Sequence, residues 1–336
     1  MSFKSLDAMF YMLQGKGIFA QGDEVVCAAL REEFGIDCNA RREDLFHGAA
    51  IRGYALDVTG VQSFIPIDRE APTGGISWVI DEYAGWDLLP PPYVGLSALI
   101  DIKKQLIYRK PVDPTPMLTS VLSKVFATDQ LSRYQVEMYE KFAVFRGFEK
   151  ITDQCIKAFE LGLNSIAIIG LIPVLEGVLR KIGELEMDDF QGNTSKDEFL
   201  KLIDHLSTLL SRQAYAYYDV PSFMRLPKFI GAFHEQIQLL NAFRAYFQTR
   251  LYENTARIVG PIDLNRHSVL HGLVTDFDKP INFYRLIIAI NFLGGTSYLL
   301  GHTESSVELP ATALSKKRAQ TYARYKAMGA ALQSDG

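Results

Sequence analysis

Hydrophobic residues recur at helical spacing through most of the chain after residue 116. This periodicity is typical of amphipathic and buried helices. Asp129 and Ser195 stand where helix N-caps are expected, and Pro280 stands where a late helix would begin. We therefore predict helices over 117–126, 129–160, 163–186, 195–218, 227–257, 264–271, 281–300 and 311–332.

The beginning of the chain has a different pattern. Two helical pieces are expected within residues 1–30, with a break at the Gly-Lys-Gly sequence of residues 15–17. β-Branched and aromatic residues then gather in short runs at 58–67, 76–83 and 105–109, with prolines and glycines between the runs. Such runs predict strands and turns.

The predicted fold class is therefore mainly α, with a helical bundle at the C-terminal end preceded by a small α/β region. We expect a small mixed α/β region of unknown role over residues 1–115 and a helical domain over residues 116–336. The most apolar runs, 165–175 and 286–295, are well short of the roughly 20 residues that a membrane helix needs. We therefore expect no membrane association.

Composition narrows the class of protein further. The 336 residues carry a formal net charge of −4, so the chain as a whole is not a polybasic nucleic-acid binder, and any such activity needs a local basic patch. The three cysteines, Cys27, Cys38 and Cys155, show no paired short spacing, which argues against a disulfide framework or a cysteine-rich zinc site. The first apolar stretch is interrupted by Asp7 and lacks a basic leader, so we expect no signal peptide and a cytoplasmic location.

Polar residues are densest between residues 260 and 272, where the neighbouring segments are apolar. Arg266, His267 and His271 lie within six positions there. If Asn265 begins a helix, Arg266 and His271 are about 140° apart around its axis, and both can still reach one ligand because the arginine side chain is long. A guanidinium can hold a phosphate with two hydrogen bonds, and an imidazole can exchange a proton near neutral pH. That combination suits the cleavage of a phosphodiester bond.

The sequence Asn265-Arg-His-Ser-Val-Leu-His-Gly272 resembles the signature of HEPN domains (higher eukaryotes and prokaryotes nucleotide-binding). That signature is an arginine followed by a polar residue and then by a histidine a few positions later. The segment 167–180, with Glu176, resembles an early acidic helix of bacterial HEPN-like proteins, and 272–293 resembles the helix after the motif. The resemblance covers roughly residues 150–300.

The resemblance implies a helical bundle, commonly a homodimer, in which arginine and histidine side chains of two protomers cut RNA without a metal or cofactor. The attacking group is the 2′-hydroxyl of the RNA. Carried over, His271 is the general acid and base, Arg266 stabilises the phosphorane, and His267 is the polar neighbour that positions them. Glu176 orients the pair, and Asn265 is a weaker candidate for support and RNA contact. Many such proteins act in toxin–antitoxin or phage-defence systems, which implies an antitoxin or another defence protein as partner.

Three other interpretations use the same residues. His267 and His271 form a His-x3-His pattern, and with Asp263 they would offer zinc ligands on one helix face, with His302 as a further candidate. Ser268 stands where the metalloprotease pattern has glutamate, so that pattern fails. The motif can also be structural, capping a buried turn in a helical interaction protein. A non-catalytic protein that binds RNA or nucleotides is the third alternative.

The segment 314–328 contains five basic residues, two tyrosines and no acid. One interpretation is an RNA contact on which a tyrosine stacks against a base. The other is a solvated basic helix whose tyrosines pack onto the bundle. The candidate RNA-binding residues here are Lys316, Lys317, Arg318, Tyr322 and Arg324.

The spacing from Arg266 to His271 occurs a second time in the chain. Arg42 and His47, which is also followed by glycine, repeat it. No long helical pattern surrounds that copy, so we interpret it as chance. It shows that the bare spacing is a common pattern, and that the surrounding helices give the later copy its weight.

Overall fold

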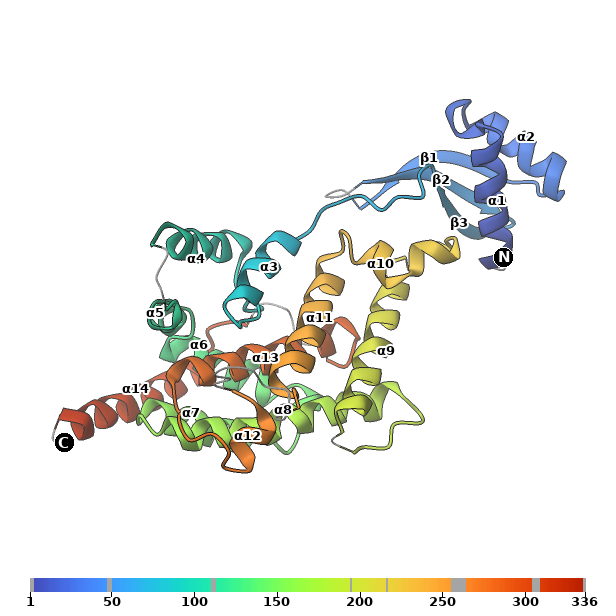
Figure 1. Cartoon of the computed structure of the whole chain (residues 1–336). Helices are drawn as coiled ribbons and strands as arrows, with labels where there is room; N and C mark the ends of the chain where they lie inside the picture. The colour runs from blue at the N-terminus through green and yellow to red at the C-terminus, as the bar shows by residue number, and fades with distance from the viewer. Residues whose placement is uncertain are drawn as a thin grey trace. The chain divides into compact units, whose positions relative to one another are not determined.

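The computed structural model describes residues 3–46, 50–109, 113–193, 195–215, 217–254, 264–303 and 309–334. The fold is mainly helical with a small mixed α/β region near the N-terminus, as predicted, and the strands of that region form a three-stranded antiparallel sheet (Figure 1). The chain forms two compact units. The first combines Met1–Trp78 with Asp204–Asn241, and the second combines Val79–Ile203 with Ala242–Gly336. The predicted boundary near residue 116 thus falls inside the second unit.

The sheet of the first unit has the order β1-β2-β3, formed by Asn39–Leu45, Ile51–Val58 and Val61–Pro66. A two-residue turn joins β2 to β3, and both turn residues, Thr59 and Gly60, have positive φ angles (52° and 86°). Positive φ at both positions matches the right-handed twist of a hairpin. Helices α1 (Phe3–Gly15) and α2 (Asp23–Phe34) complete the expected pair of N-terminal helices.

The later part of the first unit returns to this sheet. The backbone N–H of Phe64 donates to the carbonyl of Asp219 at 2.8 Å, next to the Ser63–Asp219 bridge. Two short helices follow, η4 (Ser222–Arg225) and α10 (Pro227–Ile230).

Two predicted strands are wrong. The run at 76–83 lies mostly in helix α3 (Ser77–Gly85), and the run at 105–109 is the end of helix α4 (Leu96–Arg109). In α3, Val79 and Tyr83 are four residues apart and fully buried, so the helical period places both in the core. Packing of that face outweighs the strand preference of aromatic and β-branched residues.

The core of the second unit is built on two long helices, α8 (Asn164–Glu186) and α13 (Pro280–Leu299), which pack against each other (Figure 1). Both match their predicted ranges closely. Helix α13 is buried on all sides from Ile281 to Gly294 because other helices surround it. The remaining helices of this unit include α5 (Thr115–Val125), α7 (Glu149–Glu160) and α14 (Ala313–Ser334).

Two helices predicted as continuous are interrupted. The range 129–160 contains α6 (Thr128–Arg133), the π-helical segment η2 (Tyr134–Tyr139), the short η3 (Ala143–Phe145) and α7. The range 227–257 contains α10, α11 (Glu235–Tyr246) and the π-helical segment η5 (Phe247–Leu251). π-Helical turns insert extra residues that a search for a period of 3.6 does not detect.

The predicted cap at Ser195 is confirmed, because its hydroxyl accepts the backbone N–H of Glu198 at 3.2 Å at the start of α9 (Lys196–Ala214). Asp129 is not the cap of α6: Ala127 holds that position, and Asp129 lies in the first turn, where its charge favours the helix. Over the described part of the chain, no helix is both long enough and apolar enough to cross a membrane.

Candidate functional site

A short helix, α12 (Arg266–Leu270), carries the central motif. Asn265 is its N-cap: the side-chain Oδ1 accepts the backbone N–H of Ser268 at 3.0 Å. The Nδ2 group donates to the carbonyls of Arg250 and Glu253, both at 3.0 Å. Asn265 is completely buried, so its amide serves the backbone of the site and is not available for contact with RNA.

Arg266 points from the start of α12 towards α8. Its Nε lies 2.7 Å from Oε1 of Glu176, which is the partner that the resemblance implies. The hydroxyl of Tyr252 donates to the same carboxylate oxygen, and the arginine Cζ lies 6.0 Å from the centre of the Tyr252 ring. Burial raises the pKa of Tyr252, and the hydrogen bond to Glu176 raises it further, so the phenol remains a donor.

These contacts fix the orientation of one arginine. The side chain of Glu176 is 10 % exposed, and that of Arg266 is 26 % exposed. Within the described residues, Glu176 is the only carboxylate that pairs with Arg266. The guanidinium is thus held through Nε, and its terminal nitrogens remain able to bind an anion.

A pocket of about 340 Å³ lies beside Arg266. Its described lining consists of seven residues from α9, the end of η5, the segment after it and α12: Lys196, Leu251, Tyr252, Glu253, Asn254, Arg266 and His267. A volume of this size is within the range of small-ligand sites. All seven residues belong to the second unit.

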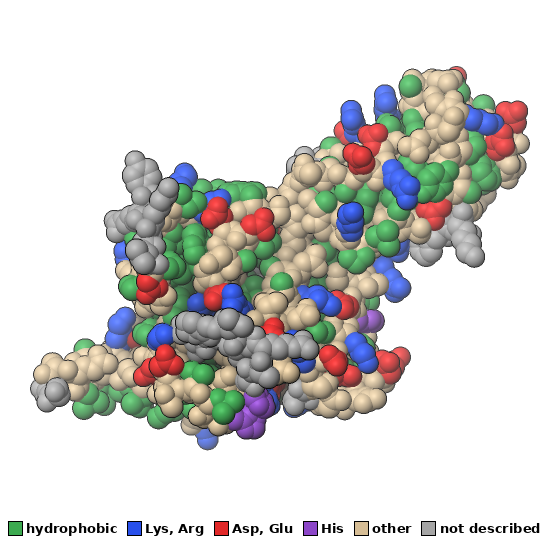
Figure 2. Space-filling view, viewed as in Figure 1, with side chains coloured by type: hydrophobic (Ala, Val, Ile, Leu, Met, Phe, Trp, Pro, Cys, Tyr) green, Lys and Arg blue, Asp and Glu red, His purple; other side chains and the backbone are tan. Residues whose placement is uncertain are grey.

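His267 and His271 lie next to each other on α12. Their ring centroids are 4.2 Å apart and both side chains are exposed, and Figure 2 shows a histidine cluster at the surface over this helix. His271 ends the helix, and Gly272 follows with a φ of 67°. His271 does not line the pocket within the described residues, whereas His267 does.

The zinc interpretation finds no support in this arrangement. No group of three or more His, Cys, Asp or Glu side chains that could hold a metal ion occurs in the part of the chain that the structure describes. Asp263, the third candidate ligand, lies outside the described residues. His302 is held elsewhere: its Nε2 contacts Glu186, and its Nδ1 lies 3.4 Å from the hydroxyl of Ser297.

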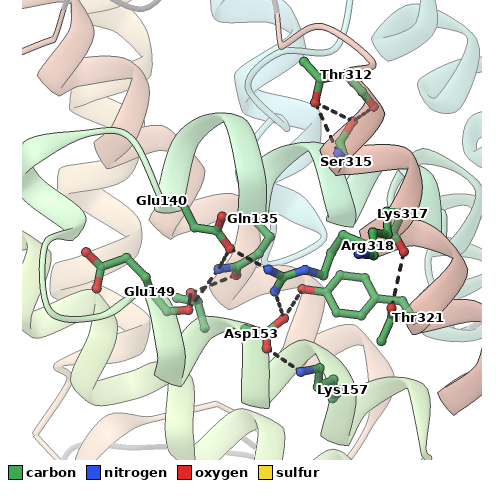
Figure 3. Close-up of polar contacts among 12 residues, drawn as sticks. Gln135, Glu140, Glu149, Asp153, Lys157, Thr312, Ser315, Lys317, Arg318 and Thr321 are labelled. Atoms are coloured by element: carbon green, nitrogen blue, oxygen red, sulfur yellow. Dashed lines mark hydrogen bonds and ion pairs between the residues drawn. The ribbon is translucent and has the colours of Figure 1, made fainter.

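The basic C-terminal segment forms α14, and its candidate residues separate into two groups. Arg318 points into the bundle, where it pairs with Asp153 and, at 3.0 Å, with Glu140 (Figure 3). Tyr322 is completely buried and donates to Asp153 at 2.8 Å, so its ring has no free face for a base. The other three candidates, Lys316, Lys317 and Arg324, are exposed.

The carboxylate of Asp153 is the centre of this buried network. Burial alone would raise its pKa, but hydrogen bonds from Lys157, Tyr322 and Arg318 together lower the pKa below its usual value. Asp153 is therefore ionised at neutral pH. Arg318 and Tyr322 attach α14 to α7, in agreement with the interpretation of the segment as a packed helix.

Lys196 and Tyr252 were not singled out in the sequence. Both lie within predicted helices, and neither stands in a recognisable motif. They reach Arg266 only through the fold, from positions 70 and 14 residues earlier in the chain. Arg42, of the earlier Arg–His pair, lies on strand β1, and His47 lies outside the described residues.

No protein-family model matches the chain, and comparisons with curated proteins and with solved structures give no match either. The resemblance to HEPN domains therefore depends on the residues quoted above and stays a prediction.

Proposed function

We propose that this protein is a metal-independent endoribonuclease whose site is centred on α12. The observation that supports this most directly is the arrangement of Arg266. Glu176 and Tyr252 hold its Nε side, and its guanidinium borders a pocket close to two exposed histidines. A preorganised cation beside a group that can take up and return a proton is what the cleavage of a phosphodiester requires.

In the proposed reaction, the 2′-oxygen of a ribose forms a bond to the adjacent phosphorus, and the bond from phosphorus to the 5′-oxygen breaks. The proton of the 2′-hydroxyl passes to His271, and a proton is returned to the leaving 5′-oxygen. Arg266 stabilises the charge on the phosphorane, and His267, whose ring is 4.2 Å from that of His271, positions it. The products carry a 2′,3′-cyclic phosphate and a 5′-hydroxyl.

The setting of this activity is part of the proposal. We place the protein in the cytoplasm, as a homodimer in which the α12 segments of two copies form one cleft. A role in phage defence or in a toxin–antitoxin pair, with a second protein that restrains the nuclease, follows from the same resemblance. The exposed positions of Lys316, Lys317 and Arg324 allow them to contact an RNA backbone.

The test is cleavage of a mixed RNA by the purified protein in EDTA, with single-stranded DNA as the control substrate. We expect cyclic-phosphate ends and intact DNA. Arg266→Ala and His271→Ala should each lower the rate by about 100-fold or more while thermal unfolding stays cooperative. Arg146→Ala, at an exposed arginine in the same unit, is the matched control and should cut like the parent.

Non-catalytic binding of RNA or a nucleotide is the second candidate, because the pocket contains Arg266 but not His271. It is the better description if the parent binds RNA through Arg266 and never cuts it. If both variants unfold and RNA is ignored, the motif is structural and the protein is a helical interaction protein. Loss of cutting in EDTA would favour the metal interpretation.

A further inference from the structure

The pocket beside Arg266 contains a second cation that the proposed reaction does not use. Lys196, the first residue of α9, lines it, and its Nζ donates to the carbonyl of Gln248 at 2.8 Å. That bond holds the ammonium group in place and leaves it further hydrogens to donate. Within the described part of the chain, no carboxylate lies at ion-pair distance from Lys196.

The acids near the pocket are engaged elsewhere. Glu176 accepts from Arg266 and Tyr252. Glu253 also lines the pocket, but its Oε1 accepts the backbone N–H of Asn254 at 3.0 Å, and it pairs with neither cation. An anion entering the pocket would therefore meet two cations that no acid among the described residues bridges.

We infer that this pocket binds the phosphate next to the scissile one, with Lys196 as its main ligand. The inference rests on the proposed function, because it places the scissile phosphate between Arg266 and His271. Arg266 and His267 line the pocket and His271 does not, so a phosphate bound inside it is not the one that contacts the proposed acid and base. Arg266 lies next to both the pocket phosphate and the proposed position of the scissile phosphate. The substrate class is therefore a ribonucleotide strand that carries at least two successive phosphates.

Binding is tested with a single-stranded RNA whose 2′-hydroxyls are all methylated, which the proposed reaction cannot cut. Lys196→Ala should weaken its binding by about ten-fold, because one charge-assisted contact is lost. The slope of log affinity against log salt concentration should become shallower by about 0.7, the value for one phosphate contact on a single strand. Lys201→Ala removes an exposed lysine from the same helix and should behave like the parent.

Two further variants sharpen this test. Glu253→Gln removes the one negative charge from the described lining and should tighten binding a few-fold, which is the opposite sign to Lys196→Ala. Lys196→Arg keeps the charge and should retain most of the affinity. In cleavage, Lys196→Ala should raise KM by about ten-fold and change kcat less than two-fold, because the contact is the same in ground and transition states.

Substrate length supplies an independent measurement. A diribonucleoside monophosphate has only the phosphate that is cut, and a trinucleotide has a neighbouring one. The parent should have a KM for the trinucleotide about ten-fold lower, and Lys196→Ala should remove that difference.

The outcomes separate this inference from the proposed function. Equal binding by Lys196→Ala and Lys201→Ala would overturn the inference even if the parent cuts RNA. Binding through Lys196 by a protein that cuts nothing would keep the anion site and reject the nuclease. No binding of the methylated strand by the parent would reject the inference, and if the parent also cuts no RNA, the proposed function is rejected with it.

Discussion

Two arginines of the second unit are held in similar ways and differ in what surrounds them. Arg318 pairs with Asp153, whose carboxylate also accepts the hydroxyl of Tyr322. Arg266 pairs with Glu176, whose carboxylate also accepts the hydroxyl of Tyr252. The two side chains are also exposed to nearly the same extent, 24 % and 26 %.

The difference lies in the remaining side of each guanidinium. A second carboxylate, Glu140, closes that side of Arg318 at 3.0 Å (Figure 3). Arg266 has a pocket there, with Lys196 on its wall. Exposure therefore does not separate a structural arginine from a candidate binding residue. What separates them is whether the chain itself supplies all the acids that the arginine can bind.

Removing each central acid should give the largest difference. Asp153→Ala leaves the buried Tyr322 hydroxyl and part of Arg318 without a partner, and we expect the free energy of unfolding to fall by about 3 kcal/mol. Glu176→Ala frees Arg266 to turn into the pocket and should cost about 1 kcal/mol. Urea unfolding followed by circular dichroism measures both. Equal losses would mean that the two arginines are equivalent structural elements.

Replacing each arginine by lysine tests the guanidinium itself. Two nitrogens of Arg318 reach two different acids, which one ammonium group cannot do, so Arg318→Lys should cost about 2 kcal/mol of stability and leave RNA cleavage unchanged. Arg266→Lys should cost less than about 1 kcal/mol and lower cleavage by about ten-fold or more. Unfolding and cleavage must be measured on the same preparations. A loss of cleavage in Arg318→Lys at a temperature where it is folded would contradict the comparison.

The tyrosines give a smaller effect of the same kind. Tyr322→Phe deletes a hydroxyl that donates to a charged acid and should lower the free energy of unfolding by about 1.5 kcal/mol. Tyr252→Phe should cost about 1 kcal/mol in stability and also slow cleavage, because Glu176 loses a contact that orients it. A Tyr252→Phe protein that cuts at the parental rate would remove Tyr252 from the site.

The smallest effect is the dependence of stability on pH. The pKa of Asp153 is lower in the folded protein than its value of about 3.9 in an unfolded chain. Its contribution to stability is therefore complete above that value and is lost as the pH falls through the folded pKa. In acid titrations, the parent should lose more stability below about pH 4 than Asp153→Asn does. Parallel curves for the two proteins would show that Asp153 is not the ionised centre of the network.

Much of the helical fold follows from the hydrophobic pattern. Helices α8 and α13 were located almost to the residue because their apolar runs are long and end at clear signals. Strands β1 and β2 were missed. In β1, charged residues such as Arg41 and Arg42 follow one another, so the sequence lacks the alternation of apolar and polar residues that marks a strand. The breaks at η2 and η5 were missed because each keeps apolar residues at helix-like intervals.

The site was predicted only in part. The motif at Arg266 and the acid at Glu176 were found from the sequence, and the structure brings them together at 2.7 Å. Lys196 and Tyr252 could not be found, because their places beside Arg266 are set by helix packing. Arg318 and Tyr322 show the opposite case: a basic and aromatic segment looks the same in sequence whether it faces solvent or the core.

The buried amide of Asn265 has a consequence for how this site can vary. It donates hydrogen bonds to the carbonyls of Arg250 and Glu253, which precede the nine residues 255–263, whereas Asn265 follows them. One side chain therefore connects the two ends of this segment. The entropy of closing such a connection grows slowly, by about 0.6 kcal/mol for each doubling of its length. Insertions between these anchored ends should therefore be tolerated. Homologues with a longer or shorter segment here should keep Arg266 and Glu176 in contact.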